Sequence, residues 1–241
     1  MNQQINFTLS LADTTLILAQ RNSEWCAHGP ILEQDIAITN ISLDLLGQAR
    51  NFYQHAAHLI GSPATEDSLA YLRTEREFKN LLITELPNGD WAQTILRQFF
   101  FSVYQSLLCT QLLKSKDEQL AAIAEKSLKE ITYHIKWSSD WVIRLGDGTA
   151  ESRHRMNNAI DYLWMYTGEF FIPAAYETIE FAAIENAWLS KVKEVFEEAG
   201  LVVPENAFMQ QGGKTGNHTE HLGFILAEMQ SLQRTYPGAQ W

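Results

Sequence analysis

The sequence predicts an all-α fold, a helical bundle with additional C-terminal helices. Apolar residues recur every three or four positions over long segments, which is the period of an amphipathic helix. Strict alternation of apolar and polar residues, as in a half-buried strand, is scarce. Clusters of proline and glycine divide the periodic segments, and no internal repeat or linker is visible. We therefore expect one helical domain over residues 1–241.

Four helices are expected before residue 115, separated by clusters of proline and glycine. Asp90 stands just before the apolar run from Trp91, where its carboxylate can accept from free amide groups as an N-cap. In the second helix, Leu43 and Leu46 lie off the main apolar stripe, so we expect more than one of its sides to be covered. The four predicted ranges are 6–22, 31–60, 66–86 and 90–114.

Four further helices follow, over 117–146, 151–167, 174–199 and 217–235. Gly146 follows Leu145 and suits the left-handed turn that ends many helices. The segment 201–216, LVVPENAFMQQGGKTG, has no helical period, and we expect it on the surface of the bundle.

The composition excludes several classes of function. Lysine and arginine number 18 and aspartate and glutamate 29, so the formal net charge is −11. Phosphate backbones and anionic lipids repel such a chain, so neither nucleic acid nor a membrane is an expected partner. The two cysteines, Cys26 and Cys109, are in no metal-ligand spacing, the N-terminus lacks signal-peptide features, and no apolar run is long enough to span a membrane. We expect a cytoplasmic protein.

The stretch KEITYHIKW at 129–137 is close to a metal motif. Di-iron helix bundles use Glu-x-x-His, with both side chains directed into the bundle. Here Glu130 is followed by Tyr133 at the third position and by His134 at the fourth. Glu130 and His134 still share one helix face, because four residues rotate a helix by about 400°. They could form half of a mononuclear site, for which the sequence offers no convincing second half.

The other predicted helices supply an incomplete set of di-iron ligands. Asp44 is the acid of the 31–60 helix, and Glu75 is that of the 66–86 helix, with Phe78 where a histidine is needed. The 90–114 helix has Ser102 at the matching depth and no carboxylate near its middle. We therefore interpret the set as a vestigial metal site, at Asp44, Glu75, Phe78, Ser102, Glu130 and Tyr133, with His134 adjacent.

The alternative to a metal site is a buried or half-buried polar network. Three acids close together raise one another's pKa unless a cation joins them. We therefore expect Arg76, Lys79 or His134 to neutralise the carboxylates of the vestigial set.

Two motifs near the C-terminus have both a structural and a functional interpretation. In HTEH, His218 and His221 could bind a metal with further ligands, although capping or interface roles are commoner for such histidines. GGKTG at 212–216 could contact an anionic ligand, but it lacks the spacing of a phosphate-binding loop and does not follow a strand. A flexible surface turn is the simpler interpretation of GGKTG.

Four stretches carry a family resemblance: EWCAHGPILEQDIAITNISLDLLGQARNF, LPNGDWAQTILRQFF, KEITYHIKW and GGKTGNHTEHLGFILAEMQSLQRTYPGAQW. They resemble the structural, non-catalytic subunit of bacterial phenylacetyl-CoA epoxidase (ring-1,2-phenylacetyl-CoA oxygenase), whose fold is ferritin-like. The resemblance runs from near the N-terminus to residue 241.

The resemblance implies a subunit of a multicomponent monooxygenase in phenylacetate catabolism. A separate catalytic subunit carries the di-iron centre, and a reductase passes electrons from NADPH through flavin and iron–sulfur groups. The subunit that this chain resembles has lost its metal ligands, and we accordingly expect no catalytic residue and no bound cofactor. Phe78, Ser102 and Tyr133 agree with that loss. A carboxylate-bridged metal enzyme, or a metal-binding helical bundle with unorthodox ligands, is the alternative.

The expected partner is the catalytic di-iron subunit, and a homodimer is plausible for the isolated chain. Aromatic side chains are favoured anchors at interfaces. The run 99–101 points in three directions around its helix, so we expect at least one ring to face outward and to meet the partner together with the 31–60 helix. The candidate anchors are Trp25, Phe99, Phe100, Phe101, Tyr104 and Trp241.

Overall fold

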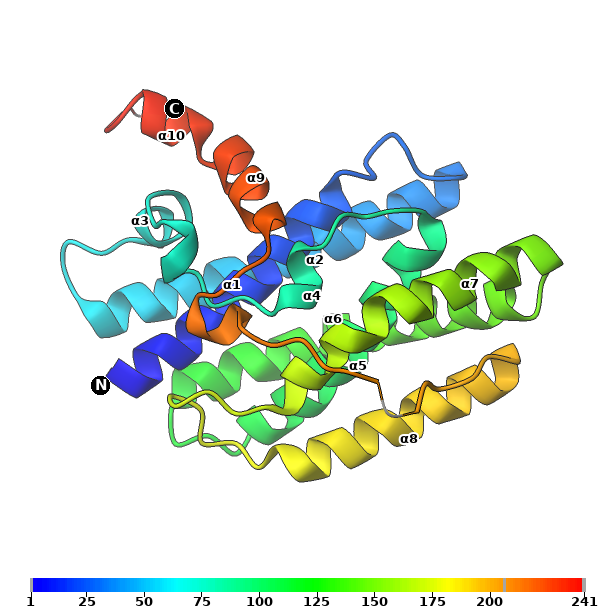
Figure 1. Ribbon diagram of the computed structural model, residues 1–241. Helices are drawn as coiled ribbons and strands as arrows, with labels where there is room; N and C mark the ends of the chain where they lie inside the picture. The colour runs from blue at the N-terminus through cyan, green and yellow to red at the C-terminus, as the bar shows by residue number, and fades with distance from the viewer. Residues whose placement is uncertain (1, 206, 240–241) are drawn as a thin grey trace. The chain divides into compact units, whose positions relative to one another are not determined.

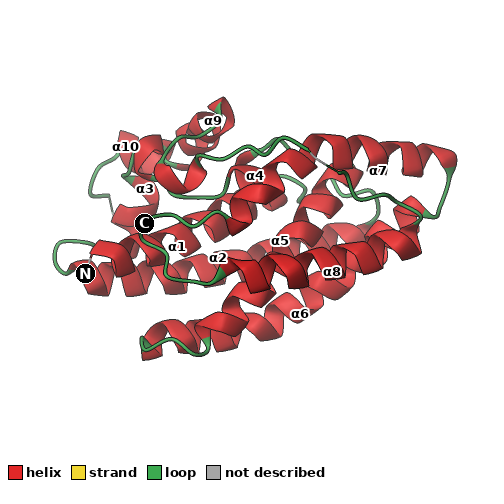
Figure 2. Ribbon diagram, turned by 60° about the horizontal axis from the view of Figure 1, so that its bottom comes forward, coloured by secondary structure: helices red, strands yellow, loops and turns green. Residues whose placement is uncertain are grey.

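The structure confirms the predicted all-α class. The computed structural model describes residues 2–205 and 207–239, and over these ranges it contains helices and loops but no strand (Figures 1 and 2). No helix in the described ranges combines the length and the hydropathy that a membrane span requires. The additional C-terminal helices are present, and long helices are paired side by side within the units described next.

Backbone contacts divide the chain into two compact units. Unit 1 comprises Met1–Pro87, Ala174–Glu177 and Gly212–Trp241, and unit 2 comprises Asn88–Pro173 and Thr178–Gln211. The expectation of one domain over 1–241 remains a prediction.

Unit 1 is built on two long helices that pack along each other, α1 and α2. The apolar stripe of α2, including Ile38, Ile41 and Leu45, is buried. Short helices and the C-terminal segment complete the unit. Its elements are α1 (Asn2–Ser23), α2 (Leu32–Ile60), α3 (Glu66–Tyr71), η1 (Glu75–Glu77), α4 (Leu82–Glu85), η3 (Gly213–Thr215), α9 (Glu220–Met229) and α10 (Ser231–Thr235).

The predicted helix over 66–86 is wrong, because α3, η1 and α4 replace it and extended backbone joins them. The amide of Lys79 donates to Asp13 Oδ2 at 2.8 Å, and the amide of Leu81 donates to the hydroxyl of Thr14 at 3.3 Å. Side chains of α1 thus satisfy backbone groups that a helix would have paired internally. The segment also buries Phe78 completely.

The helix predicted over 217–235 is interrupted between α9 and α10. The amide group of the Gln230 side chain donates to the carbonyls of Ala70 and Arg73, at 3.2 and 3.0 Å. The irregular segment 201–216 is also not wholly on the surface, because Gly213 and Lys214 are buried.

Unit 2 contains three long helices and one short one, and Asp90 caps the first, as predicted, by accepting from the amide of Gln93 at 3.0 Å. Gly146 does not end α6 in a left-handed turn, since it is the last helical residue. A Cβ there would lie 2.7 Å from the carbonyl oxygen of Ala199, so glycine permits close packing on α8. The elements are α5 (Trp91–Leu112), α6 (Glu118–Gly146), α7 (Ala150–Leu163), η2 (Trp164–Phe171) and α8 (Phe181–Ala199).

The aromatic run of α5 is buried, so the prediction that one of its rings meets a partner is wrong. Phe99, Phe100, Phe101 and Tyr104 are each at most 3% exposed. The reason is that α5 packs against α6, α7 and α8, which together cover it. Of the other predicted anchors, Trp25 is half-buried and position 241 lies outside the described residues.

Candidate functional site

On α6 the buried side chains stand one position later than the suspected metal motif predicts. Tyr133, at the histidine position of the predicted motif, is 47% exposed, whereas His134 is fully buried. Ile131 is also fully buried and stands three residues before His134. The inward pair with Glu-x-x-His spacing is therefore Ile131 and His134, with an apolar side chain at the carboxylate position. Glu130 is half-buried beside it.

The buried face of α2 carries a second pair with the same spacing. Leu45 and Gln48 are at most 1% exposed and three residues apart, while Asp44 is half-buried. A Glu-x-x-His template placed on these inward positions meets leucine and an amide. Neither side chain supplies the anionic oxygen or the imidazole that iron prefers.

The helices that pair with α2 and α6, which are α1 and α5, offer one buried carboxylate between them over the described residues. On α5 none of the buried polar side chains is acidic over the described residues: Arg97 is cationic, Gln98 donates to the hydroxyl of Ser102 at 2.8 Å, and Gln105 lies one turn beyond Ser102. On α1 the buried acid is Asp13. Within neither unit do the described residues bring three or more His, Cys, Asp or Glu side chains together as a metal site.

Asp13 is held by Arg73 rather than by a metal. Its carboxylate accepts from the guanidinium of Arg73, from the hydroxyl of Tyr53 at 2.6 Å and from the amide of Lys79 at 2.8 Å. Burial and the charge of Asp13 raise the pKa of Tyr53 well above its ordinary value. Burial alone would lower the pKa of Arg73, but the charges of Asp13, Tyr53 and Glu77 and the hydrogen bond to Asp13 together outweigh burial and raise that pKa. The guanidinium also covers the ring of Phe78 at 4.3 Å.

Glu75 does not point into a bundle from a long helix, as the sequence suggested. It is exposed in η1, and its Oε2 is 3.0 Å from the place where a Cβ of Gly223 would be. Neither Arg76 nor Lys79 forms an ion pair with it over the described residues. Lys79 instead lies over the ring of Tyr176 at 5.6 Å. The expected neutralisation of Glu75 by these two residues is therefore wrong, and the cation that joins a buried acid of this region is Arg73.

His218 of the HTEH motif pairs with Glu85 of α4. Its Nδ1 is 2.8 Å from Glu85 Oε2, and its Nε2 is 3.0 Å from the carbonyl of Phe78, which can only accept. Glu85 also accepts from the Asn80 side chain at 2.8 Å and from the amide of Thr219 at 2.6 Å. The histidine therefore joins the C-terminal segment to the segment 78–85.

Two residues of the GGKTG motif, Gly213 and Lys214, are buried, so the interpretation of the whole motif as a surface turn is wrong for these positions, whereas Thr215 is exposed. Lys214 Nζ pairs with Glu177 at 3.0 Å, and the hydroxyl of Tyr176 donates to the carbonyl of Lys214 at 2.8 Å. A Cβ on Gly213 would lie 2.1 Å from the carbonyl oxygen of Asn80, so only glycine fits there.

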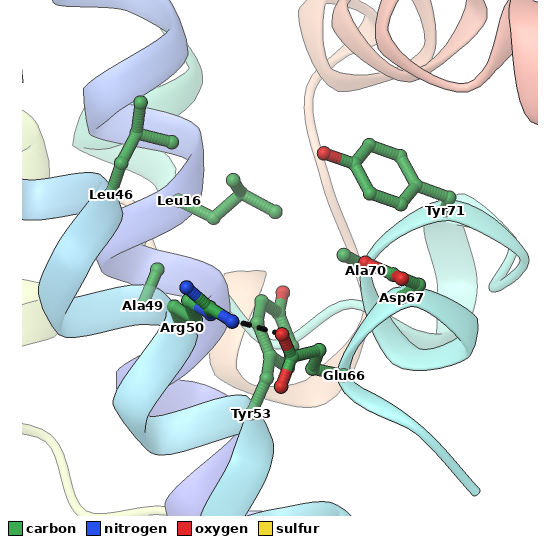
Figure 3. Close-up of a pocket in the computed structure, with 9 residues that line it drawn as sticks. All are labelled: Leu16, Leu46, Ala49, Arg50, Tyr53, Glu66, Asp67, Ala70 and Tyr71. Carbon is green, nitrogen blue, oxygen red and sulfur yellow. Dashed lines mark hydrogen bonds and ion pairs between the residues drawn. The ribbon is translucent and has the colours of Figure 1, made fainter. Parts of the chain in front are cut away.

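A pocket of about 320 Å³ opens in unit 1 between α1, α2 and α3 (Figure 3). Its interior is apolar, and Arg50 forms an ion pair of 3.0 Å with Glu66 at its edge. Asp67 and Tyr71 stand on the α3 side. Burial, and then the charge of Asp67, raise the pKa of the Tyr71 hydroxyl above its ordinary value. The pocket can accept a side chain or a small ligand with an apolar body and a polar end.

Several of these residues were not predicted from the sequence, although the sequence pattern points to some of them. Asp13 interrupts the apolar run LSLADTTLILA, where a buried carboxylate needs a partner. The pairs Leu45–Gln48 and Ile131–His134 have i, i+3 spacing, but only burial distinguishes them from their neighbours. Arg73 and Glu85 left no signal, because the prediction placed both on one helix.

Two comparisons with known proteins cover the whole chain. A family model described as phenylacetic acid catabolic protein matches residues 1–241. The chain is 48% identical, over 249 aligned residues, to one of the subunits of the 1,2-phenylacetyl-CoA epoxidase of Escherichia coli (strain K12). That alignment covers 100% of this chain and 100% of the relative.

Proposed function

This chain belongs to the phenylacetic acid catabolic protein family, and from that membership we propose that it is a non-catalytic subunit of a phenylacetyl-CoA epoxidase. In this proposal it pairs with a separate catalytic subunit, which carries the di-iron centre, and holds that subunit in its working form. Electrons reach the complex from NADPH through a reductase with flavin and iron–sulfur groups. No reaction step is assigned to a residue of this chain.

The inward side chains of the long helices carry this proposal. A carboxylate-bridged di-iron centre needs four carboxylates and two histidines that project inward from four helices. Two of the buried pairs at Glu-x-x-His spacing, Leu45 with Gln48 and Ile131 with His134, have an apolar side chain at the carboxylate position. The buried acid of α1, Asp13, is already bound to Arg73. In neither unit do these described donors fit a di-iron centre, which supports the proposal of a degenerate site in a ferritin-like fold.

The alternative is a metal enzyme, or a metal-binding bundle, with unorthodox ligands. It would have to use Glu130 with His134, the pair of acid and imidazole on one face of α6. The two proposals differ in the iron that each expects on the purified chain.

Metal analysis of the chain expressed alone in iron-supplemented medium tests the proposal. We expect iron far below stoichiometric amounts, and the same amount in a Glu130→Gln, His134→Ala variant. About two irons per chain, lost in that variant, would establish the alternative. The variant Ile131→Glu, which creates Glu-x-x-His with His134 on the buried face of α6, serves as a gain-of-ligand control and should raise the iron content if these positions are the inward ones.

A further inference from the structure

A row of exposed apolar side chains runs along one face of α2. Leu32, Ile36 and Leu43 are 72%, 51% and 59% exposed. At about 100° per residue these three and Gly47 lie within an arc of about 60°, and the row extends over roughly 22 Å. It is the face opposite the buried stripe that packs on α1. Such a row on a folded helix marks an interaction surface.

Gly47 leaves space on this face for close approach. No atom lies within 4 Å of the place where its Cβ would be. Glycine in the middle of a helix costs stability by up to about 1 kcal/mol relative to alanine, so its presence here calls for a reason. A second backbone packing on the row would supply one.

The row continues into the pocket of Figure 3, because Leu46 and Arg50 line the pocket and lie on the same side of α2. The interior of the pocket is formed by small and apolar side chains, among them Leu16 and Ala70. Arg50 is engaged by Glu66, whereas no described cation pairs with Asp67 at the mouth. An apolar pocket with a carboxylate at its mouth suits a lysine or arginine, whose stem is apolar and whose end is cationic.

The charges around the row favour a different chain over a second copy as its occupant. Four carboxylates lie in the first turn of α2 or line the pocket, and the guanidinium of Arg50 pairs with one of them, Glu66. In a two-fold dimer built on this face, the patch would meet itself and bring like charges together. A partner with a basic rim avoids that repulsion. The four acids are Glu33, Asp35, Glu66 and Asp67.

We propose that this face of α2, together with the pocket between α1, α2 and α3, is the docking surface for the catalytic subunit. The partner contributes apolar side chains to the row and inserts a lysine or arginine into the pocket beside Asp67. This inference rests on the proposed function, since it needs a partner subunit. It places the interface on unit 1, whereas the aromatic run of α5 is buried and unavailable.

The test measures the dissociation constant between this chain and the purified catalytic subunit of the same organism by isothermal titration calorimetry. The variant Ile36→Glu, Leu43→Glu should weaken binding by on the order of a hundredfold, because buried apolar anchors dominate interfaces. A matched variant, Val202→Glu, Phe224→Glu, adds the same charges at exposed apolar positions off this face and should bind as the wild type does. Circular dichroism melting curves check that all the variants fold.

A second pair of variants tests the pocket. Asp67→Asn should weaken binding roughly threefold to tenfold and reduce its dependence on salt, since it removes one charge pair. Asp161→Asn, at an exposed acid of α7, should change neither quantity.

The outcomes separate the two proposals. If the wild type binds the catalytic subunit and the charged α2 variant binds equally well, the docking surface is wrong and the proposed function stands. If the wild type has no affinity for that subunit, the proposed function fails, and the inference fails with it. If the α2 variant loses only self-association, measured by analytical ultracentrifugation, the occupant is a second copy and the inference is overturned.

Discussion

Unit 1 buries three pairs of oppositely charged or titratable side chains, whereas unit 2 packs a cluster of aromatic rings in its core. The pairs are Asp13–Arg73, Glu85–His218 and Glu177–Lys214. In unit 2 the ring of Phe100 lies within 6.0 Å of the rings of Trp164, Trp188 and Phe196, measured between centroids.

The difference follows from the backbone that each unit has to hold. In unit 1 each pair joins segments far apart in the sequence, and the segments 73–85 and 212–219 are largely irregular. Polar contacts there satisfy backbone and side-chain groups that regular helices would satisfy alone. In unit 2 the aromatic cluster is formed by α5, η2 and α8. Helices pair their backbone groups internally, so the space between them has to be filled by side-chain volume rather than by hydrogen bonds.

The largest expected effect is on the aromatic core. Trp188 is 2% exposed, contacts four rings and donates to the carbonyl of Phe100 at 2.9 Å. Trp188→Ala should lower the free energy of unfolding by about 4–5 kcal/mol through the cavity and the lost bond. Trp188→Phe keeps most of the volume and should cost about half as much or less. Urea unfolding measures both, and a loss below about 1 kcal/mol in Trp188→Ala would contradict the role of the rings.

The second-largest effect is expected when the Asp13–Arg73 pair of unit 1 is broken. Arg73→Met removes the cation of Asp13 and should cost about 3–4 kcal/mol, because a buried carboxylate loses its counter-charge. The double variant Asp13→Asn, Arg73→Met should recover at least half of that loss. Equal stability of the single and double variants in urea unfolding would show that the pair does not act as a unit.

The smallest effect is a dependence on pH at the edge of unit 1. The amide of Thr74 first, and then its hydroxyl, donate to Glu77 and lower the pKa of this carboxyl. A carboxyl with a lowered folded-state pKa stabilises the protein above its unfolded pKa, about 4.3, and this stabilisation is lost as the pH falls through the folded-state value. Because Glu77 is exposed, Glu77→Gln should cost less than about 1 kcal/mol at pH 7. The difference from wild type in urea unfolding should shrink toward pH 3, and growth on acidification would contradict it.

The comparison of the two units also shows which parts of the fold could be predicted from the sequence alone. Regular, strongly periodic helices such as α1, α2, α5 and α6 were predicted within a few residues, because one buried stripe determines each. The segment 66–86 was not, because its backbone partners, Asp13 and Thr14, are about sixty residues away in sequence. Local pattern cannot show such partners.

The sequence predicted which helices carry the candidate site, but not which of two neighbouring positions on each helix faces inward. Glu130 and Asp44 attracted attention as acids at helical depth, yet the fully buried positions are Ile131, His134, Leu45 and Gln48. One residue rotates a helix by about 100°, so a choice between neighbours decides which side chain faces inward. The predicted partner contact of Phe99–Phe101 failed for a related reason, because the burial of these rings depends on three covering helices that the local sequence does not show.

The most direct test of the central claim is reconstituted epoxidation of phenylacetyl-CoA. The purified catalytic subunit and reductase are supplied with NADPH, and turnover is titrated against this chain after iron has been removed from it. The account predicts low turnover without the chain and a rise that saturates near a fixed ratio with the iron-free chain. Turnover that is independent of the chain, or that rises only with iron-loaded chain, would contradict a supporting, non-catalytic role.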